Sequence, residues 1–372
     1  MVRHLRKVAV IGAGVVGLAA ADALCQAGVE VRLFEKAAPG QAESVGLTRI
    51  FRQAHSDPRL VRLAMRAREG WQAWERRCGR RLLGEEGLIV TGADLAPAWG
   101  RALREAGAPC RDLDTAAFAD RLPIGRPPPA AALWDPAAGA IRARRTVEFL
   151  CHGLAGRIVP AAVLELAATE TGATVRTARE TWACDAALVT AGIDTPGLAA
   201  QVGVRVPTAL IRHSRFTFAP LRAAGQRPPA CWIDRSGAFG DDLSAYALPV
   251  GTTGRYAVGV SQGDHDFPAS VGAEEVSRLS LDLARRYVPA ALPGLDPTPV
   301  DEVRCTYNGV GVPEGDGFGA VRQGVVTVFY GNNLFKFAPL LGELLGQAVL
   351  RSEVPADLNA GLSSAVKPGL GS

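Results

Sequence analysis

The feature that most constrains this 372-residue chain is a glycine-rich turn near its N-terminus. Glycines stand at the first, third and last positions of residues 12–17, after an apolar run at 7–11 that is typical of a strand. The small residues at 15–27 predict a helix, and residues 29–34 predict a second strand that ends at Glu35. This order predicts a strand–helix–strand unit at the start of the chain.

Each glycine of the turn has a physical reason to be there if the unit binds a dinucleotide. Gly12 permits the tight turn, Gly14 lets the backbone approach a pyrophosphate, and Gly17 lets the helix pack on the strand. The helix N-terminus favours the phosphates, and Glu35 would accept hydrogen bonds from ribose hydroxyls. The motif does not separate NAD from FAD, because both place a pyrophosphate on this helix end. A glycine turn with only a structural role is the simpler alternative.

Composition narrows the class of protein. With 48% hydrophobic and 21% charged residues, a chain of this length suits two globular domains. A net charge of +4 with dispersed arginines gives no reason to expect nucleic acid as a partner. Glycines and Asp22 interrupt the apolar N-terminal run, so we expect neither a membrane span nor a signal peptide.

The reactive residue types give little sign of other chemistry. The seven cysteines are widely spaced and form no Cys-x-x-Cys pair, which favours a reducing, cytoplasmic location over disulfides or zinc. The five histidines show no ligand spacing, so no metal is expected, and no Gly-x-Ser-x-Gly motif suggests a serine hydrolase.

The rest of the chain reads as alternating helices and strands, with a sheet-rich middle over residues 205–262. Residues 88–134 predict one short strand and a single helix near 96–106, with extended connections around them. The Pro-rich stretch 289–299 is interpreted as a connection. Further helices are expected at 58–82, 144–154, 274–287 and 337–350, and further strands at 186–190, 303–307 and 325–330.

Three segments carry a resemblance to a known family. Residues 47–52 read Leu-Thr-Arg-Ile-Phe-Arg, residues 304–307 read Arg-Cys-Thr-Tyr, and residues 331–337 read Gly-Asn-Asn-Leu-Phe-Lys-Phe. Together they resemble the D-amino-acid-oxidase-like flavoenzymes, and within them monomeric sarcosine oxidase and N-methyltryptophan oxidase. The resemblance implies a mixed α/β fold with a Rossmann-like FAD-binding domain at 1–85, 140–204 and 300–372. A second, antiparallel-sheet substrate domain would comprise 86–139 and 205–299.

The resemblance also implies roles for individual residues. Arg52 and Lys336 resemble a pair that holds a substrate carboxylate, and Tyr307 and Tyr246 would line the substrate cavity. Cys305 matches the position where a thiolate joins the 8α-methyl carbon of the flavin. The FAD contacts implied are Gly12, Gly14, Val15, Val16, Gly17, Glu35, Lys36, Thr48, Arg49, Val163, Ala191, Gly192, Gly331, Asn332, Asn333, Leu334, Phe335 and Lys336.

The chemistry of the residue types agrees with this carboxylate pair. Two cations from distant parts of the sequence would compensate a buried carboxylate, and a guanidinium can hold it through two parallel hydrogen bonds. Lys336 stands between Phe335 and Phe337, where an unpaired ammonium would be costly. Taken alone, however, Arg52 could be an ordinary surface arginine and Cys305 an inert buried cysteine.

Two departures from the family pattern bear on the reaction. The position of a lysine that assists electron transfer to dioxygen falls on Ala257, and that of a substrate-site histidine falls on Ser261. Either another cation such as Arg255 takes the lysine's place, or the electron acceptor is not dioxygen, or the register is displaced by a residue or two.

The resulting hypothesis is FAD-dependent oxidation of the C–N bond of a small, carboxylate-bearing amine to an imine. The substrate would be a secondary, N-methyl or cyclic amino acid, the electrons would pass to O₂, and the protein would be a monomer or weak homodimer. The alternatives are a dehydrogenase or desaturase that uses a quinone or carrier protein, an NAD-linked dehydrogenase, and a flavin-binding module without catalysis.

Overall fold

The computed structural model describes residues 6–169, 171–222, 228–240, 242–251, 253–263, 266–310 and 316–359. The chain divides into two compact units. Unit 1 comprises residues 1–45, 144–210 and 306–372, and unit 2 comprises 46–143 and 211–305. Residues 46–85, which we assigned to the FAD-binding domain, lie in unit 2. There β3 (Thr48–Phe51) pairs with β7 (Gly139–Arg142), and α2 (Pro58–Cys78) packs against α3 (Leu95–Glu105).

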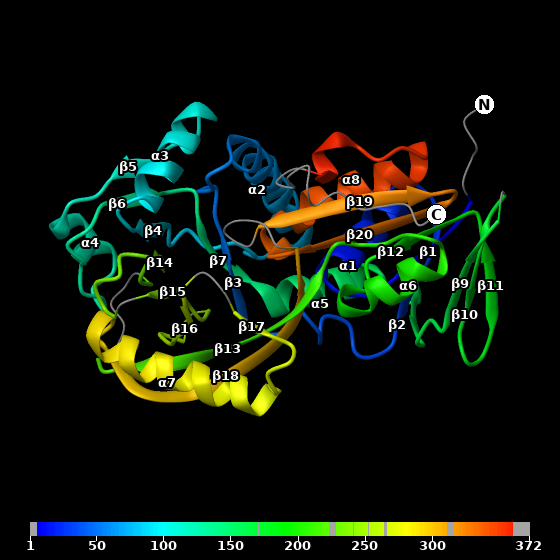
Figure 1. Ribbon diagram of the computed structural model, residues 1–372. Coiled ribbons are helices and arrows are strands. Elements are labelled where there is room, and N and C mark those ends of the chain that lie inside the picture. Colours follow the sequence, from blue (N-terminus) through cyan, green and yellow to red (C-terminus); the bar gives the residue numbers. More distant parts are fainter. Residues whose placement is uncertain are drawn as a thin grey trace. The chain divides into compact units, whose positions relative to one another are not determined.

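Unit 1 is built on a six-stranded sheet, and the glycine turn follows its strand β1, Lys7–Ile11 (Figure 1). This central strand pairs in parallel with β2 (Glu30–Glu35) and β12 (Ala186–Val189). Helix α1 (Val15–Gln26) connects β1 to β2, as the sequence predicted. The order is completed by β8 (Ile158–Pro160) beyond β2, and by β20 (Val326–Asn332) and then β19 (Gly317–Gln323) beyond β12.

Small residues let two helices of unit 1 approach closely. Helix α8 (Ala338–Arg351) packs on α1, and a Cβ added at Gly342 would lie 2.7 Å from Ala19. Ala9 and Ile11 belong to a separate apolar cluster with side chains of the second, three-stranded sheet and of α6 (Thr195–Gln201). This sheet, whose strands β9 (Glu165–Ala168), β10 (Ala173–Arg176) and β11 (Thr181–Cys184) are drawn in green in Figure 1, was not predicted.

Unit 2 is built on a nine-stranded, largely antiparallel sheet. At its centre β16 (Tyr256–Gln262) lies between β13 (Ala209–Pro220) and β15 (Leu243–Pro249), antiparallel to both. Beyond β15 follow β14 (Cys231–Asp234), β4 (Leu88–Thr91), β6 (Ala132–Asp135) and β5 (Arg111–Asp112), while β17 (Phe267–Pro268) and β18 (Leu295–Gly309) pair with β13. The fold is therefore mixed α/β, with a Rossmann-like unit and an antiparallel-sheet unit, as predicted.

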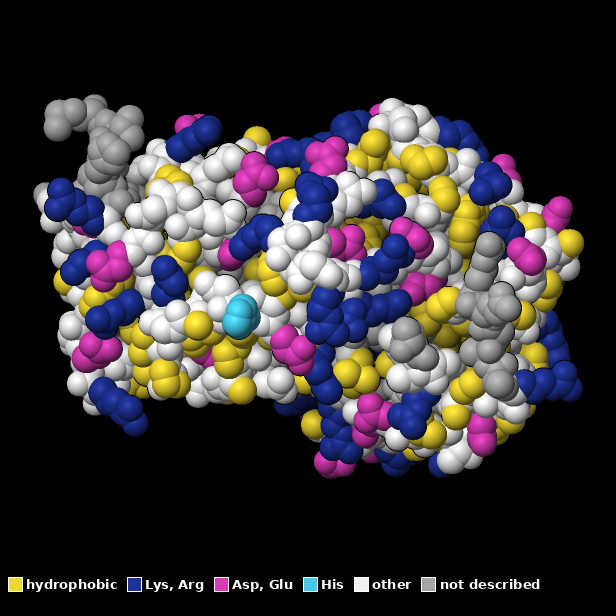
Figure 2. Space-filling view, turned by 180° about the vertical axis from the view of Figure 1, so that it is seen from behind, with side chains coloured by type: hydrophobic (Ala, Val, Ile, Leu, Met, Phe, Trp, Pro, Cys, Tyr) yellow, Lys and Arg dark blue, Asp and Glu magenta, His cyan; other side chains and the backbone are white. Residues whose placement is uncertain are grey.

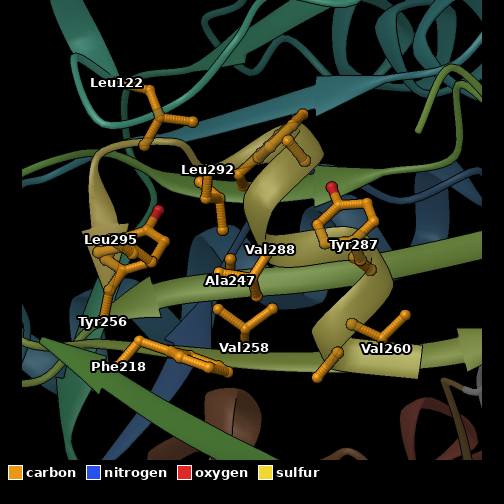
Figure 3. Close-up of a cluster of buried hydrophobic side chains, with 14 of the residues drawn as sticks. Leu122, Phe218, Ala247, Tyr256, Val258, Val260, Tyr287, Val288, Leu292 and Leu295 are labelled. Carbon is orange, nitrogen blue, oxygen red and sulfur yellow. The ribbon is translucent and has the colours of Figure 1, made fainter. Parts of the chain in front are cut away.

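Helix α7 (Ala273–Ala291) covers one face of the unit 2 sheet. Figure 3 shows Tyr287 and Val288 of this helix beside Val258 and Val260 of β16, within one buried apolar cluster. Because successive side chains of a strand point to opposite faces, Ala257 and Ser261 lie on the other face. That second face carries the charged residues described below.

Two local features differ from the sequence predictions, and a third agrees with them. Residues 88–134 contain a second helix, α4 (Thr115–Arg121), which Asp114 caps by accepting a hydrogen bond from the Ala117 N–H. The stretch 289–299 is not a connection, because α7 extends through Pro289 and β18 begins at Leu295. Helix α5 (Ala143–Gly153) confirms the predicted helix at 144–154.

The surface shows no segregation of charge on the face in Figure 2. Lys and Arg side chains are interspersed there with Asp and Glu. No helix among the described residues combines the length and the apolar character needed to cross a membrane.

Candidate functional site

The glycine turn of unit 1 has the close contacts that its sequence predicts. A Cβ at Gly12, whose φ is +100°, would lie 2.5 Å from the Thr190 carbonyl oxygen. A Cβ at Gly17 would lie 1.9 Å from the Gly12 carbonyl oxygen. At Gly14, the N-cap of α1, the nearest atom to an added Cβ is the Ser44 Oγ, at 3.5 Å. The N-cap residue Gly14 has no side chain with which to cap the helix, so backbone N–H groups of its first turn can receive an anion.

Glu35, at the end of β2, forms hydrogen bonds with the backbone of the glycine turn. Glu35 accepts hydrogen bonds from the backbone N–H groups of Ala13, at 2.7 Å, and Ala37, at 2.9 Å. The next residue, Lys36, forms a half-exposed ion pair with Asp194 at 2.5 Å. The predicted contact between Glu35 and ribose stays a prediction.

A second acid of unit 1 was missed by the sequence analysis. Glu43 lies against Gly192, since a Cβ at Gly192 would be 2.7 Å from the Glu43 Oε1. Burial raises the Glu43 pKa to about 7; the Ile193 N–H opposes this shift, and the nearby Asp194 adds to it. Next to it, the Ser44 Oγ accepts a hydrogen bond from the Val15 N–H at 3.0 Å. The chain segment after β2 therefore contacts both the start of α1 and Gly192.

The C-terminal motif of unit 1 buries an ion pair. Lys336 is 5% exposed, and its ammonium donates to the Asp316 carboxylate at 2.8 Å and to the Asn333 carbonyl oxygen at 2.9 Å. The apolar setting anticipated from Phe335 and Phe337 is present, since both are buried. The carboxylate beside Lys336 thus comes from this chain.

The remaining predicted contacts of unit 1 are spread over several elements. Ala191 and Gly192 follow the end of β12, and the Gly192 carbonyl oxygen accepts a hydrogen bond from the Asn308 amide at 2.8 Å. Asn332 ends β20, and its side chain accepts from the Val310 N–H at 3.3 Å. Val163 packs at the edge of the apolar cluster around Ala9 and Ile11, and Tyr307 lies partly buried in β18.

Unit 2 brings two guanidinium groups to one point. A Cβ at Gly46, whose φ is +112°, would lie 2.8 Å from Arg215 Nη2 and 3.1 Å from Arg49 Nη1. Arg215 is only 5% exposed, and its guanidinium makes no hydrogen bond or ion pair among the described residues. Burial, with the neighbouring charge of Arg215, lowers the Arg49 pKa to about 10. Two neighbouring buried cations repel each other, so an anion that binds between them is strongly favoured.

Two other predicted residues lie within electrostatic range of this pair. The Cys305 thiol and the Tyr246 phenol both act to raise the Arg49 pKa against those larger effects. The Tyr246 ring covers Gly259, where an added Cβ would be 2.4 Å from the ring. The structure therefore groups Arg49, Tyr246 and Cys305, which lie far apart in the sequence, around Arg215.

Ala257, which stands where the family pattern has a lysine, lies in the sheet of unit 2. Ala257 is buried and pairs with Thr217 of β13, and Gly259 pairs with Arg215. Arg255, the substitute considered from the sequence, is exposed and stands directly before β16. Arg215 is thus a buried cation on the strand next to Ala257, one row along the same face. The alternation in β13, where Phe216 and Phe218 enter the apolar cluster under α7, was the signal that could have identified it.

Arg52 and Thr48 are held by backbone groups of unit 2. Arg52 is 6% exposed, lies 4.3 Å above the Trp99 ring and donates to the Ala54 carbonyl oxygen at 2.5 Å. It is therefore not a surface arginine. The buried Thr48 hydroxyl donates to the Pro249 carbonyl oxygen at 3.1 Å.

Comparison with known proteins decides the family. The model of the family described as FAD dependent oxidoreductase matches residues 7–348. The chain belongs to this family. A search of curated protein sequences found no match.

Solved structures with this fold extend across almost the whole of this FAD dependent oxidoreductase. NikD, described as an unusual amino acid oxidase essential for nikkomycin biosynthesis, has a TM-score of 0.79 at 21% identity and covers 94% of this chain and 95% of its own. L-proline dehydrogenase from P. horikoshii has a TM-score of 0.77 at 16% identity, with coverage of 95% and 96%. Glycine oxidase from Geobacillus kaustophilus has a TM-score of 0.75 at 20% identity, with coverage of 96% and 100%.

The residues of this FAD dependent oxidoreductase fit the family's cofactor. Unit 1 offers a close glycine turn at Gly12 and a helix that begins at Gly14, where the backbone is open to close approach, the arrangement that a pyrophosphate requires. Unit 2 offers Cys305 and Arg49 within electrostatic range of one another.

Proposed function

We propose that the protein oxidises the C–N bond of a small amine that carries a carboxylate, giving an imine and passing the electrons to O₂. The substrate class is a secondary, N-methyl or cyclic amino acid. The observation that carries this proposal is the guanidinium pair of Arg49 and Arg215, in which Arg215 is buried beside no carboxylate of the described chain. Such a pair suits a reaction in which anionic groups bind and negative charge develops.

The division of labour between the units follows from their residues. Unit 1 would hold the dinucleotide at the glycine turn, and unit 2 would supply the substrate side. FAD, when bound, supplies the acceptor for a hydride equivalent from the carbon next to nitrogen. Arg52 would orient the substrate carboxylate, and Arg49 and Arg215 would stabilise the negative charge. Because Asp316 already offsets the charge of Lys336, we expect the arginines of unit 2 to dominate carboxylate binding.

Arg215 also supports dioxygen as the acceptor. A cation beside the position of the reaction favours electron transfer to O₂, and Arg215 supplies a cation one strand away from Ala257. Ala257 itself still favours the second candidate, a dehydrogenase or desaturase that uses a quinone or a carrier protein.

The cofactor test is the absorbance of the purified protein before and after acid precipitation. A yellow pellet that loses its colour in Cys305→Ala would support covalent attachment, whereas colour left in the supernatant of the unaltered protein would contradict it. All seven cysteines are free in the structure, which supports the cytoplasmic location that we propose. We further propose a monomer or weak homodimer.

The substrate test is anaerobic bleaching of the flavin by N-methyl and cyclic amino acids, each paired with the amine that lacks its carboxylate. We expect the amino acid to bleach the flavin and its decarboxylated partner to be at least about tenfold slower, since one buried charge-assisted contact is worth about 1.5–3 kcal/mol. Admission of air should restore the colour promptly. Slow reoxidation would favour the dehydrogenase, and a flavin that no amine bleaches would favour a non-catalytic module.

A further inference from the structure

A chain of polar contacts leads away from the Tyr246 phenol. The Tyr246 Oη lies 2.6 Å from His213 Nε2, and His213 Nδ1 lies 3.3 Å from the Asp266 carboxylate. The Ser261 hydroxyl donates to the same oxygen of Asp266 at 2.7 Å. These four residues come from β15, β13, the residue before β17, and β16, respectively, and all belong to unit 2.

The surroundings fix which atom donates at each step. Burial raises the Tyr246 pKa; the charge of Arg215 opposes this, Cys305 and Asp266 add to it, and Arg49 opposes it. The phenol is therefore neutral and carries a proton that it can donate to His213 Nε2. The Asp266 carboxylate only accepts, so His213 Nδ1 carries the hydrogen that faces it.

The environment of His213 suits a proton that moves. His213 is 8% exposed, whereas the side chain of Asp266 is 20% exposed. Asp266 therefore connects the buried hydrogen bonds of Tyr246 and His213 to water. Other charges packed around β13 have partners of their own. Glu302 of β18 accepts from Ser214 and pairs with Arg304, and Arg212 donates to the carbonyl oxygens of Ala269 and Val271.

We propose that Tyr246, His213 and Asp266 form a proton relay that deprotonates the substrate ammonium group before the C–N bond is oxidised. Tyr246 would be the catalytic residue that contacts the amine, and His213 and Asp266 would act through it. Ser261, at the position of the family's histidine, would orient Asp266. This inference rests on the function proposed above.

The transfer balances without an external reagent. One N–H bond of the ammonium breaks as an O–H bond forms at Tyr246, and the original phenol O–H bond breaks as an N–H bond forms at His213 Nε2. The substrate leaves this step as a neutral amine with a free lone pair, and His213 becomes an imidazolium beside Asp266. The phenol is never required to ionise, so its raised pKa does not oppose the relay.

The first test examines the relay in the resting holoprotein, without turnover. Nitrogen-15 NMR of labelled histidines reports which ring nitrogen carries hydrogen, and His213→Asn assigns the signal. We expect the Nδ1–H form in the unaltered protein and a shifted Nε2 signal in Tyr246→Phe. An Nε2–H form would overturn the relay, because the phenol could not donate to that nitrogen.

The second test measures the rate of anaerobic flavin bleaching against pH. At pH near 7 we expect Tyr246→Phe and His213→Asn to be about 100-fold slower than the unaltered protein, within the usual range for proton transfer by a positioned side chain. The deficit should shrink by about tenfold per pH unit as more of the amine arrives unprotonated. A role in structure alone would lower the rate equally at every pH.

Matched controls separate the relay from general damage. Tyr287→Phe removes the hydrogen bond that another buried phenol donates, here to the Asp234 carboxylate at 2.7 Å, and His152→Asn removes an exposed histidine of α5. Both should keep the pH profile of the unaltered protein. If Tyr246→Phe and His213→Asn keep it too while substrate still bleaches the flavin, the relay is wrong and the proposed function stands. If no amine bleaches the unaltered protein, the proposed function and the relay's role in it both fail, and the NMR result still reports the hydrogen-bond chain.

Discussion

Lys336 in unit 1 and Arg215 in unit 2 are equally buried, each 5% exposed, but only Lys336 has a carboxylate beside it in the described part of the chain. Asp316, itself 2% exposed, offsets the ammonium at 2.8 Å. Arg215 has Arg49 as a neighbour instead, and the two guanidinium groups approach the same point at Gly46. A buried cation with its own carboxylate belongs to the fold, whereas one without a carboxylate is suited to an anion that arrives from outside.

Removal of Asp316 is expected to give the largest effect. Asp316→Asn keeps the size of the side chain but leaves the buried ammonium uncompensated, which should lower the free energy of unfolding by about 4 kcal/mol. Urea unfolding monitored by circular dichroism measures this change. Asp316→Leu combined with Lys336→Met removes both charges and should unfold within about 1 kcal/mol of the unaltered protein. If Asp316→Asn leaves the free energy of unfolding unchanged, the Lys336–Asp316 ion pair does not stabilise the fold, and the contrast with Arg215 fails.

Arg215→Met should give the opposite pattern. We expect turnover with O₂ to fall about 100-fold, the usual cost of removing one buried group that stabilises developing charge. The free energy of unfolding should stay constant or rise by about 1 kcal/mol, because a buried charge without a carboxylate is lost.

Two variants make the Arg215 experiment specific. Arg215→Lys restores the charge and should recover about tenfold of the rate, since a lysine lacks the planar fork of the guanidinium. Arg304→Met removes a half-exposed arginine of β18 that pairs with Glu274 and Glu302, and it should change neither quantity appreciably. A marked loss of stability in Arg215→Met would show that Arg215 is structural, like Lys336.

The sequence predicted the local elements well where one motif determined them. The glycine turn fixes β1 and α1 because Gly12 and Gly17 have contacts that no Cβ could occupy. The sequence also predicted that an unpaired Lys336 would be costly between two phenylalanines. It did not identify Asp316, because that carboxylate is brought near by the antiparallel pairing of β19 with β20, in which Gly317 lies opposite Asn332.

The site in unit 2 was only partly predictable for the same reason. Arg49, Tyr246 and Cys305 could be proposed one at a time from the resemblance, but their grouping depends on which strands pair. Arg215 and His213 share one face of β13 because they are two residues apart. Only the register of β13 against β16 puts Arg215 opposite Gly259, where the Tyr246 ring lies. Such register is set by the whole sheet and not by a local pattern.

Glu43 extends the comparison to an acid and is expected to give the smallest effect. Its pKa is raised from 4.5 to about 7, so between these values the folded protein binds more protons than the unfolded chain. Stability therefore falls as pH rises through this window, and the loss stays above it. Glu43→Gln removes the titration, and after allowance for partial exposure it should be more stable than the unaltered protein by about 2 kcal/mol at pH 8. Near pH 4 the two proteins should unfold alike, because the carboxyl is then protonated in both the folded and the unfolded state.

Urea unfolding of both proteins at pH 4 and pH 8 measures the difference. An equal difference at both pH values would show that the lost contact of Glu43, and not its charge, is responsible. A pH-dependent gain would mean that burial of the Glu43 carboxylate next to Gly192, close to the start of α1, makes its charged form costly to the fold.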